Sequence, residues 1–211
     1  MTVAQGIVAL VPMKPLRLGK TRLSGHLTPS DRATLSLNML GVVVESCVKA
    51  ELSHVWVLGG DDTVECQAIE LGVQWRDDNG VGLNLALAQA FEWVFAKGLT
   101  ACYLSADLPF VTPEDVLALV ELSEIGQRLT LSPARRDGGT NAMIVPVDSV
   151  FRPALGAGSF RRHRQLAATL GIQPRLYDSP GLGLDLDTAD DLKDYQEMRP
   201  DLMDQLIGRE L

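Results

Sequence analysis

The sequence lacks paired cysteines, a long apolar run and an excess of basic residues. Its three cysteines, Cys47, Cys66 and Cys102, are odd in number and widely spaced, which fits neither a disulfide framework nor a zinc site. No uninterrupted apolar run is long enough to cross a bilayer. A signal peptide requires a basic residue before its apolar region, and none precedes the first apolar run of this chain. We therefore expect a reduced cytoplasmic protein with no membrane partner.

Basic residues are the minority among the charged ones. There are 19 Lys and Arg against 27 Asp and Glu, which gives a net charge of −8. This balance argues against non-specific binding of nucleic acid, so we expect no nucleic-acid partner. Many of the cations gather in two regions, residues 14–22 and 128–164. Such islands suit a small anionic ligand, although each is also typical of a solvated surface.

Apolar runs and helical patterns alternate along the chain. With 211 residues, it is expected to form a single domain over residues 1–211. The predicted strands are residues 7–11, 54–58, 73–75, 101–105, 129–132, 141–145 and 175–177. The predicted helices are residues 28–50, 63–71, 83–97 and 160–170, and one that starts at 112. This alternation predicts an α/β three-layer sandwich with a mostly parallel, mixed sheet, whose ligands bind beyond the carboxyl ends of the strands.

An acidic stretch at residues 184–192 carries the most informative pattern. If its first residues form a strand, Asp185 and Asp187 share one face, and Thr188 then caps a helix. Asp107 follows another predicted strand and would lie at the same edge of a parallel sheet. Three carboxylates there suit a hard divalent cation such as Mg²⁺. The alternative is that these acids only solubilise loops and favour a helix start.

The segment Gly19-Lys20-Thr21 follows a buried strand but is not a P-loop. The Walker pattern requires a glycine five positions before Gly19, and that position is Lys14. The cations Lys14, Lys20 and Arg22 can still hold phosphates as side-chain charges.

Two glycine-rich segments are candidate ligand loops. Residues 156–159 precede a helix, and the backbone N–H groups of such a loop can bind an anion. A bound anion would explain the arginine-rich helix start at 161–164, and so would a solvated basic face. Residues 137–141 have the composition of a turn between two strands. The hydroxyl of Thr140 and the amide of Asn141 directly follow its two glycines. His163 is expected to be a partly buried or surface histidine and not a catalytic base.

Taken together, these segments resemble the phospholactate or phosphoenolpyruvate guanylyltransferase family of coenzyme F420 biosynthesis. The resemblance covers about residues 7–195 and departs at Ala157, where the family often has proline. The motifs that carry it are, in order, Val11–Leu23, Ser105–Pro109, Asp137–Ala142, Gly156–Phe160 and Asp185–Leu192. It implies a nucleotidyltransferase fold like that of the nucleotide-diphospho-sugar transferases.

The resemblance also implies a reaction and a set of site residues. GMP from GTP is joined to phosphoenolpyruvate, 2-phospho-L-lactate or 3-phospho-D-glycerate, pyrophosphate is released, and the cofactor is Mg²⁺. The next transferase of the F420 pathway is a candidate acceptor of the product. The positions that match metal-binding catalytic carboxylates are Asp107, Asp185 and Asp187. The positions that match contacts to the phosphorylated acid are Thr140, Gly156 and Ser159. The positions that match the basic loop facing GTP are Lys14, Lys20 and Arg22.

Two other functions remain open at this point. A molybdopterin- or sugar-phosphate-type transferase is disfavoured, because the Leu-Ala-Gly-Gly loop of those enzymes is replaced by Val-Pro-Met-Lys-Pro. A non-catalytic nucleotide-binding module is disfavoured by the presence of all three aspartates. Among the acids we favour phosphoenolpyruvate on general grounds, with residues 84–88 as candidates for selecting it. Residues 203–211 are a short helix or a frayed end to which we assign no chemistry.

Overall fold

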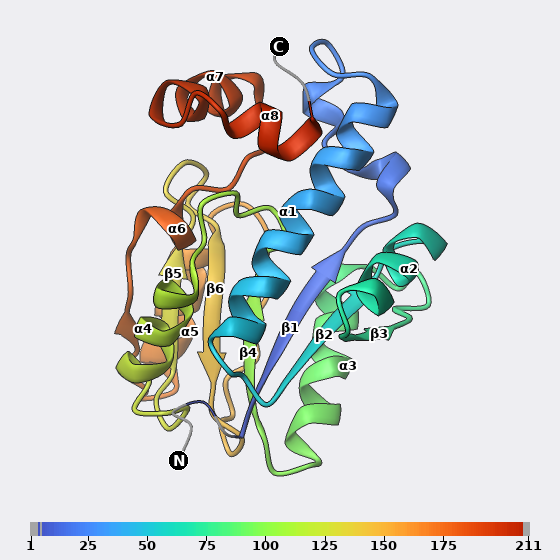
Figure 1. Cartoon of the computed structure of the whole chain (residues 1–211). Coiled ribbons are helices and arrows are strands. Elements are labelled where there is room, and N and C mark those ends of the chain that lie inside the picture. The colour runs from blue at the N-terminus through green and yellow to red at the C-terminus, as the bar shows by residue number, and fades with distance from the viewer. Residues whose placement is uncertain (1–3, 5, 209–211) are drawn as a thin grey trace.

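The computed structural model describes residue 4 and residues 6–208. In this part of the chain, seven strands form one sheet in the order β3-β2-β1-β4-β6-β5-β7 (Figure 1). The strands are β1 (Ile7–Met13), β2 (His54–Gly59), β3 (Gln74–Arg76), β4 (Thr100–Leu104), β5 (Thr130–Pro133), β6 (Thr140–Val145) and β7 (Arg175–Leu176). Strand β6 is antiparallel to both of its neighbours, and the other pairs are parallel. The predicted α/β fold with a mixed, mostly parallel sheet is confirmed.

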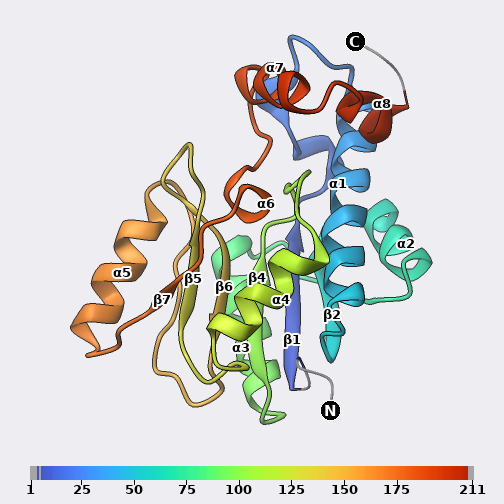
Figure 2. The ribbon, with the colours of Figure 1, turned by 60° about the vertical axis from the view of Figure 1, so that its left-hand side comes forward.

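Helices cover both faces of the sheet (Figure 2). They are α1 (Pro29–Lys49), α2 (Asp62–Glu70), α3 (Leu83–Phe95), α4 (Pro113–Leu122), α5 (Ser159–Thr169), α6 (Pro180–Gly183), α7 (Ala189–Met198) and α8 (Leu202–Ile207). Side chains of β1 alternate between two cores because successive residues of a strand face opposite ways. Val11 packs in a core with α1, α2 and α4, whereas Leu10 packs in another with α3 and α5. The central strand is therefore buried on both faces, as its continuous apolar run predicts.

The same capping motif starts helices α1, α4 and α7. In each, a threonine hydroxyl accepts a hydrogen bond from the amide three residues on, and the aspartate at that position bonds back to the threonine amide. The threonines are Thr28, Thr112 and Thr188. Such reciprocal bonds satisfy amides that the first turn leaves without helical partners, which explains why these helices begin where the sequence predicts.

A third core lies beyond the carboxyl edge of the sheet. There α8 packs against α1, and α7 packs against α8 (Figure 1). Of the segment 203–211, residues 203–207 are helical, and residues 209–211 lie outside the described residues. The strand expected at residues 184–187 is wrong. This segment follows the short helix α6 and is bonded to the loop after β4, through a hydrogen bond from the Leu186 amide to the carbonyl of Asp107 (3.1 Å). Leu186 is fully buried, which fixes the segment without a strand ladder.

Candidate active site

A pocket of about 910 Å³ lies at the carboxyl edge of the sheet. Strands β1 and β4 end there, and β6, which runs the opposite way, begins there at Thr140. Residues from all three strands line the pocket, together with the loops at 14–22, 155–157 and 185–187. Its size is that of a site for a small ligand, and its place is the one expected for an open α/β sheet.

Three aspartates meet on one wall of this pocket. One carboxylate oxygen from each of Asp107, Asp185 and Asp187 lies within 4.8 Å of the others. The Ser105 hydroxyl donates to Asp107 Oδ1 (2.6 Å), and the Asn141 amide donates to Asp185 Oδ1 (3.0 Å). These bonds hold two of the carboxylates in fixed orientations. The structure thus brings together the three predicted carboxylates.

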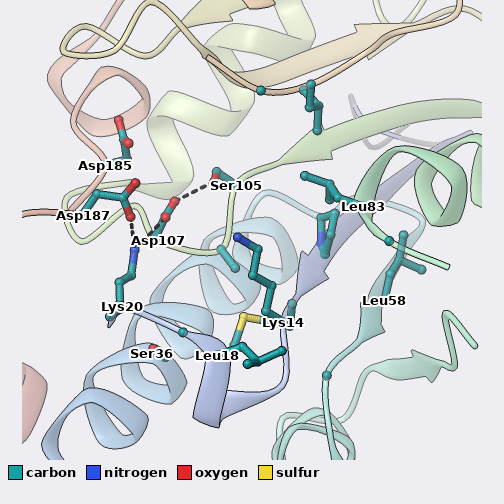
Figure 3. Close-up of a pocket in the computed structure, with 18 of the residues that line it drawn as sticks. Lys14, Leu18, Lys20, Ser36, Leu58, Leu83, Ser105, Asp107, Asp185 and Asp187 are labelled. Carbon is teal, nitrogen blue, oxygen red and sulfur yellow. Dashed lines mark hydrogen bonds and ion pairs between the residues drawn. The ribbon is translucent and has the colours of Figure 1, made fainter. Parts of the chain in front are cut away.

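Lys20 places its ammonium between two of these carboxylates (Figure 3). Its Nζ donates to Asp107 Oδ2 at 2.7 Å and to Asp187 Oδ1 at 2.8 Å. The side chain is only 8% exposed, and the backbone has φ +48°, the left-handed region that costs a non-glycine residue energy. Arg22 lies at the rim of the group, with Nη1 4.0 Å from Asp187 Oδ2. A buried cation in a strained backbone indicates a position fixed for its charge.

The charges of this cluster shift one another's pKa values. Burial alone disfavours the ionised forms, but the attraction within the pair outweighs it, so the pKa of Asp107 is lowered and that of Lys20 is raised. Among the residues that the structure describes, none forms an ion pair with Asp185. Burial, helped by the charge of Asp107 and opposed by the Asn141 bond, raises the pKa of Asp185 to about 6. Lys20 therefore neutralises only part of the cluster.

The donor set of the cluster fits a divalent cation. Carboxylate oxygens are the preferred ligands of hard cations such as Mg²⁺ and Mn²⁺. Burial, and to a smaller extent the charges of Asp107 and Asp187, raise the pKa of Asp185, and Lys20 shows that a cation is accommodated between Asp107 and Asp187. Asp107, Asp185 and Asp187 are therefore the residues that would hold a metal ion.

The start of α7 fixes the backbone that carries Asp185 and Asp187. Asp191 Oδ2 accepts hydrogen bonds from the amides of Asp187 (3.0 Å) and Thr188 (2.7 Å), and the Tyr195 hydroxyl donates to the carbonyl of Asp185 (2.9 Å). Asp191 is in turn paired with Arg136, whose Nε lies 3.0 Å from Asp191 Oδ1. The capping acid of this helix therefore also positions the carboxylate segment.

Hydroxyl groups form a different wall of the same pocket. Thr140 begins β6 and Ser159 begins α5, and the Ser159 hydroxyl donates to Thr140 Oγ1 at 3.2 Å. Both side chains are buried, yet both line the pocket together with Gly156. His163 Nδ1 lies 3.0 Å from Thr140 Oγ1 on the side away from solvent. The three residues predicted to contact the acid are therefore neighbours in the structure.

The backbone of the 156–159 loop offers fewer free amides than the sequence suggests. The Ser159 amide donates to the carbonyl of Gly156 (2.9 Å), and the Phe160 amide donates to that of Gly138 (3.1 Å). Gly138 and Gly158 both have positive φ, +69° and +67°, which lets their backbones approach closely. An anion here would therefore depend more on the hydroxyls and less on the first helical amides.

Two of the arginines at 161–164 contact the protein itself. Arg162 folds back onto the loop and donates to the carbonyl of Ala157, and Arg164 lies over the ring of Phe160. The solvated-face interpretation accounts for Arg164.

Asn84, one of the predicted selectivity residues, makes two hydrogen bonds with the backbone of Leu155 (2.7 and 3.2 Å), so it holds a pocket loop in place.

Lys14 extends from the end of β1 into the pocket (Figure 3). Its side chain is exposed, which suits a cation that meets a ligand from solution. Sequence reasoning placed Lys14, Lys20 and Arg22 together, and all three line the pocket. It did not foresee that Lys20 is the internal partner of the aspartates.

Sequence reasoning missed four supporting residues. Ser105 and Asn141 orient the carboxylates, Tyr195 holds the backbone of Asp185, and His163 contacts Thr140. The polar residues directly after strand ends were a usable signal for Ser105 and Asn141. No local pattern identifies the partners of Tyr195 and His163, since their contacts join distant segments.

Comparison with known proteins gives a family match over most of the chain. The model of the family described as "Guanylyl transferase CofC like" matches residues 7–196. A protein of Rubrobacter xylanophilus named phosphoenolpyruvate guanylyltransferase is 37% identical over 88% of this chain and 91% of its own length. A protein of Methanothermobacter thermautotrophicus named 2-phospho-L-lactate guanylyltransferase is 31% identical over 87% of this chain and 81% of its own.

Solved structures show the same fold at low sequence identity. A protein of Desulfovibrio desulfuricans G20 described as a nucleotide-diphospho-sugar transferase has a TM-score of 0.75 at 17% identity and covers 95% of this chain and 88% of its own. Glucosyl-3-phosphoglycerate synthase from Mycobacterium tuberculosis, solved with Mn²⁺ and UDP, has a TM-score of 0.58 at 16% identity and covers 96% of this chain and 78% of its own.

In the described part of this chain, no helix has the length and apolarity to span a bilayer. The chain belongs to the CofC-like guanylyltransferase family.

Proposed function

We propose that this protein transfers GMP from GTP to the phosphate of a small phosphorylated carboxylic acid and releases pyrophosphate, using Mg²⁺ held by Asp107, Asp185 and Asp187. The observation that carries the proposal is the shared pocket. One of its walls presents three carboxylates around a buried cation, and another presents the hydroxyls of Thr140 and Ser159. Two anionic substrates can therefore meet between a metal site and neutral hydrogen-bond donors.

Positioning and charge neutralisation are the main tasks of such a site. The acceptor's phosphate oxygen attacks the α-phosphorus of GTP, and a phosphate monoester is already largely ionised at pH 7 because its second pKa is about 6. No general base is required. Bound Mg²⁺ supplies positive charge for the phosphate oxygens and the developing charge of the leaving group.

The residues of this chain have separate roles in the proposal. Thr140, Gly156 and Ser159 hold the phosphorylated acid, with the Thr140 hydroxyl as the donor and the Ser159 hydroxyl bonded to Thr140. Lys14 and Arg22 supply positive charge toward the phosphates of GTP. Holding both substrates in one orientation converts a reaction between two anions into an effectively unimolecular step.

Lys20 has a role that depends on the metal. In the structure its ammonium is bound to Asp107 and Asp187. With a divalent cation bound to these carboxylates, the Lys20 ammonium would no longer be needed to neutralise them and would be available to the departing pyrophosphate. The buried position of the ammonium keeps it within the site in either state.

We propose phosphoenolpyruvate as the acceptor and coenzyme F420 biosynthesis as the pathway. The name of the Rubrobacter relative supports this acceptor, and that of the Methanothermobacter relative makes 2-phospho-L-lactate the first alternative. The two acids differ by two hydrogens, so a small number of pocket contacts decides between them.

The test is pyrophosphate release from GTP and MgCl₂ with phosphoenolpyruvate, 2-phospho-L-lactate or 3-phospho-D-glycerate as the single acceptor. The next transferase of the pathway is included to trap the product. We expect turnover with phosphoenolpyruvate. Turnover with another of the three acids would change the acceptor, and turnover only with a sugar phosphate or another unrelated compound would overturn the F420 assignment.

A further inference from the structure

His163 is fully within the protein and makes two hydrogen bonds that fix its ring. It is 1% exposed, and the ring of Phe151 packs against it edge-on, with centroids 5.7 Å apart. The backbone amide of Ala154 donates to His163 Nε2 at 3.0 Å. An amide can only donate, so Nε2 must be the unprotonated nitrogen of the ring.

This bond determines the direction of the next one. With Nε2 as acceptor, the neutral ring carries its hydrogen on Nδ1, and Nδ1–H donates to Thr140 Oγ1 at 3.0 Å. Burial lowers the pKa of His163 to about 4, and the neighbouring Arg162 acts in the same direction. The neutral tautomer is therefore the stable form at physiological pH.

The bonds at Thr140 then leave only one use for its hydroxyl hydrogen. A hydroxyl oxygen has two acceptor sites and one hydrogen to donate. Both acceptor sites are occupied, by His163 Nδ1–H and by the hydroxyl of Ser159. Among the described residues, these are the side chains that bond to Thr140 Oγ1, and the residue lines the pocket.

We propose that His163 is a positioning residue that makes Thr140 an obligatory hydrogen-bond donor to an anionic oxygen of the phosphorylated acid. This inference rests on the proposed function, because Thr140 is assigned there to the acid. It extends that function by assigning a role to a buried residue that does not line the pocket. The donor direction favours carboxylate or phosphate oxygens, which only accept, and disfavours an amide N–H or an ammonium at the same place.

Two variants separate the two bonds of the ring. In His163→Asn, the side-chain amide lies near the position of Nδ1 and can still donate to Thr140. In His163→Gln, the longer side chain reaches toward the position of Nε2, where it can accept from Ala154 but not donate to Thr140. Both replace a buried ring with a smaller amide, so they are matched for loss of packing against Phe151.

The experiment measures binding of phosphoenolpyruvate by titration calorimetry in MgCl₂, and the KM values for the acid and for GTP. We expect His163→Gln to weaken acid binding and raise its KM about tenfold, as for one misdirected hydrogen bond to a charged group. His163→Asn should stay within about threefold of the original protein. The KM for GTP should be unchanged in both, and melting temperatures should fall equally.

A double variant supplies a second, independent test of whether His163 acts through Thr140. If His163 acts through Thr140, adding His163→Gln to Thr140→Val should not weaken acid binding further. Equal effects of Gln and Asn on acid binding, or additive effects in the double variant, would show that the role of His163 is only structural. If the original protein binds none of the three acids but binds GTP, the proposed acceptor class and the role of His163 in binding it both fail, whereas a failure confined to the variants overturns His163 alone.

Discussion

The two walls of the pocket differ in the groups that they offer to the anionic substrates of the proposed reaction. The wall of Asp107, Asp185 and Asp187 is charged, and Lys20 provides an internal cation. The wall around Thr140 is neutral, and the Thr140 hydroxyl is oriented by its hydrogen bonds to His163 and Ser159. Under the proposed function, a metal on the charged wall would replace the lysine contacts of Asp107 and Asp187, whereas the neutral wall would need no such exchange. We therefore expect the charge of the aspartate wall to determine metal affinity and its pH dependence, and the hydrogen-bond direction at Thr140 to determine which acid binds.

The largest expected effect comes from removing a carboxylate of the charged wall. Asp107→Asn keeps the size of the side chain but removes the charge that holds the metal. We expect pyrophosphate release to fall by about 10³-fold or more, because neutralisation of phosphate charge accounts for several kcal/mol of the barrier. The matched control is Asp190→Asn on the exposed first turn of α7, which should keep full activity.

An activity of Asp107→Asn within tenfold of the original protein would contradict the assignment of the metal site. Measuring acid binding in the same variant compares the two walls directly. Thr140 and its partners lie on the other wall, so the binding of phosphoenolpyruvate in the absence of metal should change less than turnover does.

Replacing Lys20 tests the internal cation. Lys20→Met leaves Asp107 and Asp187 without their shared partner, and the free energy of unfolding of the metal-free protein should fall by about 2 kcal/mol. The loss is smaller than for a fully buried pair, because the Asp187 side chain is 43% exposed. Urea denaturation with and without MgCl₂ measures it, and Lys49→Met, which breaks a surface pair with Glu45, is the control.

Metal should largely restore the stability of Lys20→Met, since a divalent cation replaces the missing ammonium. The dissociation constant for Mn²⁺ should also decrease, because the metal no longer competes with the lysine. Weaker Mn²⁺ binding in this variant would show that Lys20 supports the metal site instead of standing in for the ion.

The sequence was sufficient for the elements whose signals are local. Threonine caps with an aspartate three residues on start α1, α4 and α7 where they were predicted, and the apolar run of β1 predicted a buried strand. The strand predicted at residues 184–187 is absent from the structure for a related reason. Its alternating Leu and Asp pattern requires one buried face, but a single fully buried leucine and one backbone bond to Asp107 satisfy that requirement without a strand.

The charges of the site were predictable, but their partners were not. The three aspartates follow strand ends or precede a helix cap, so local sequence located them. The bond of Lys20 to Asp187 spans 167 positions and that of Thr140 to His163 spans 23, and no periodicity encodes such pairs. His163 was interpreted as a partly buried or surface histidine because its two bonds appear only when α5 packs beside β6.

The pH dependence of metal binding should distinguish the two walls. The pKa of Asp185 is raised to about 6, so the folded metal-free protein holds this proton more tightly than the unfolded chain does. Its contribution to stability is therefore present near pH 4 and is lost as the pH rises through 6. Metal binding requires the carboxylate, so Mn²⁺ affinity measured by calorimetry should rise about tenfold from pH 5 to pH 7.

Asn141→Leu sharpens this prediction. The Asn141 amide donates to Asp185 and lowers its pKa, so removing it should move the midpoint of the Mn²⁺ profile to higher pH. His163, whose pKa is about 4, should contribute no change over this range. A flat metal profile between pH 5 and pH 7 would contradict the raised pKa of Asp185.

The smallest expected effect tests whether the charged wall depends on its support. Arg136 bonds to Asp191 (3.0 Å) and Asp194 (2.6 Å), and Asp191 in turn holds the amide of Asp187. Arg136→Ala should weaken Mn²⁺ binding about threefold, because a partly exposed ion pair contributes no more than about 1 kcal/mol. Arg135→Ala, which breaks a surface pair with Asp178, should leave Mn²⁺ binding unchanged.

The adjacent arginines thus give a matched pair in which only one is connected to the metal ligands. Equal Mn²⁺ affinities for the two variants would mean that the capping bonds of Asp191 hold Asp187 without help from Arg136. Acid binding provides the contrast, since the neutral wall is oriented from α5 and β6 and has no bond to Arg136. If both walls weakened together, the two would share one support, and the charged and neutral walls would not be independent.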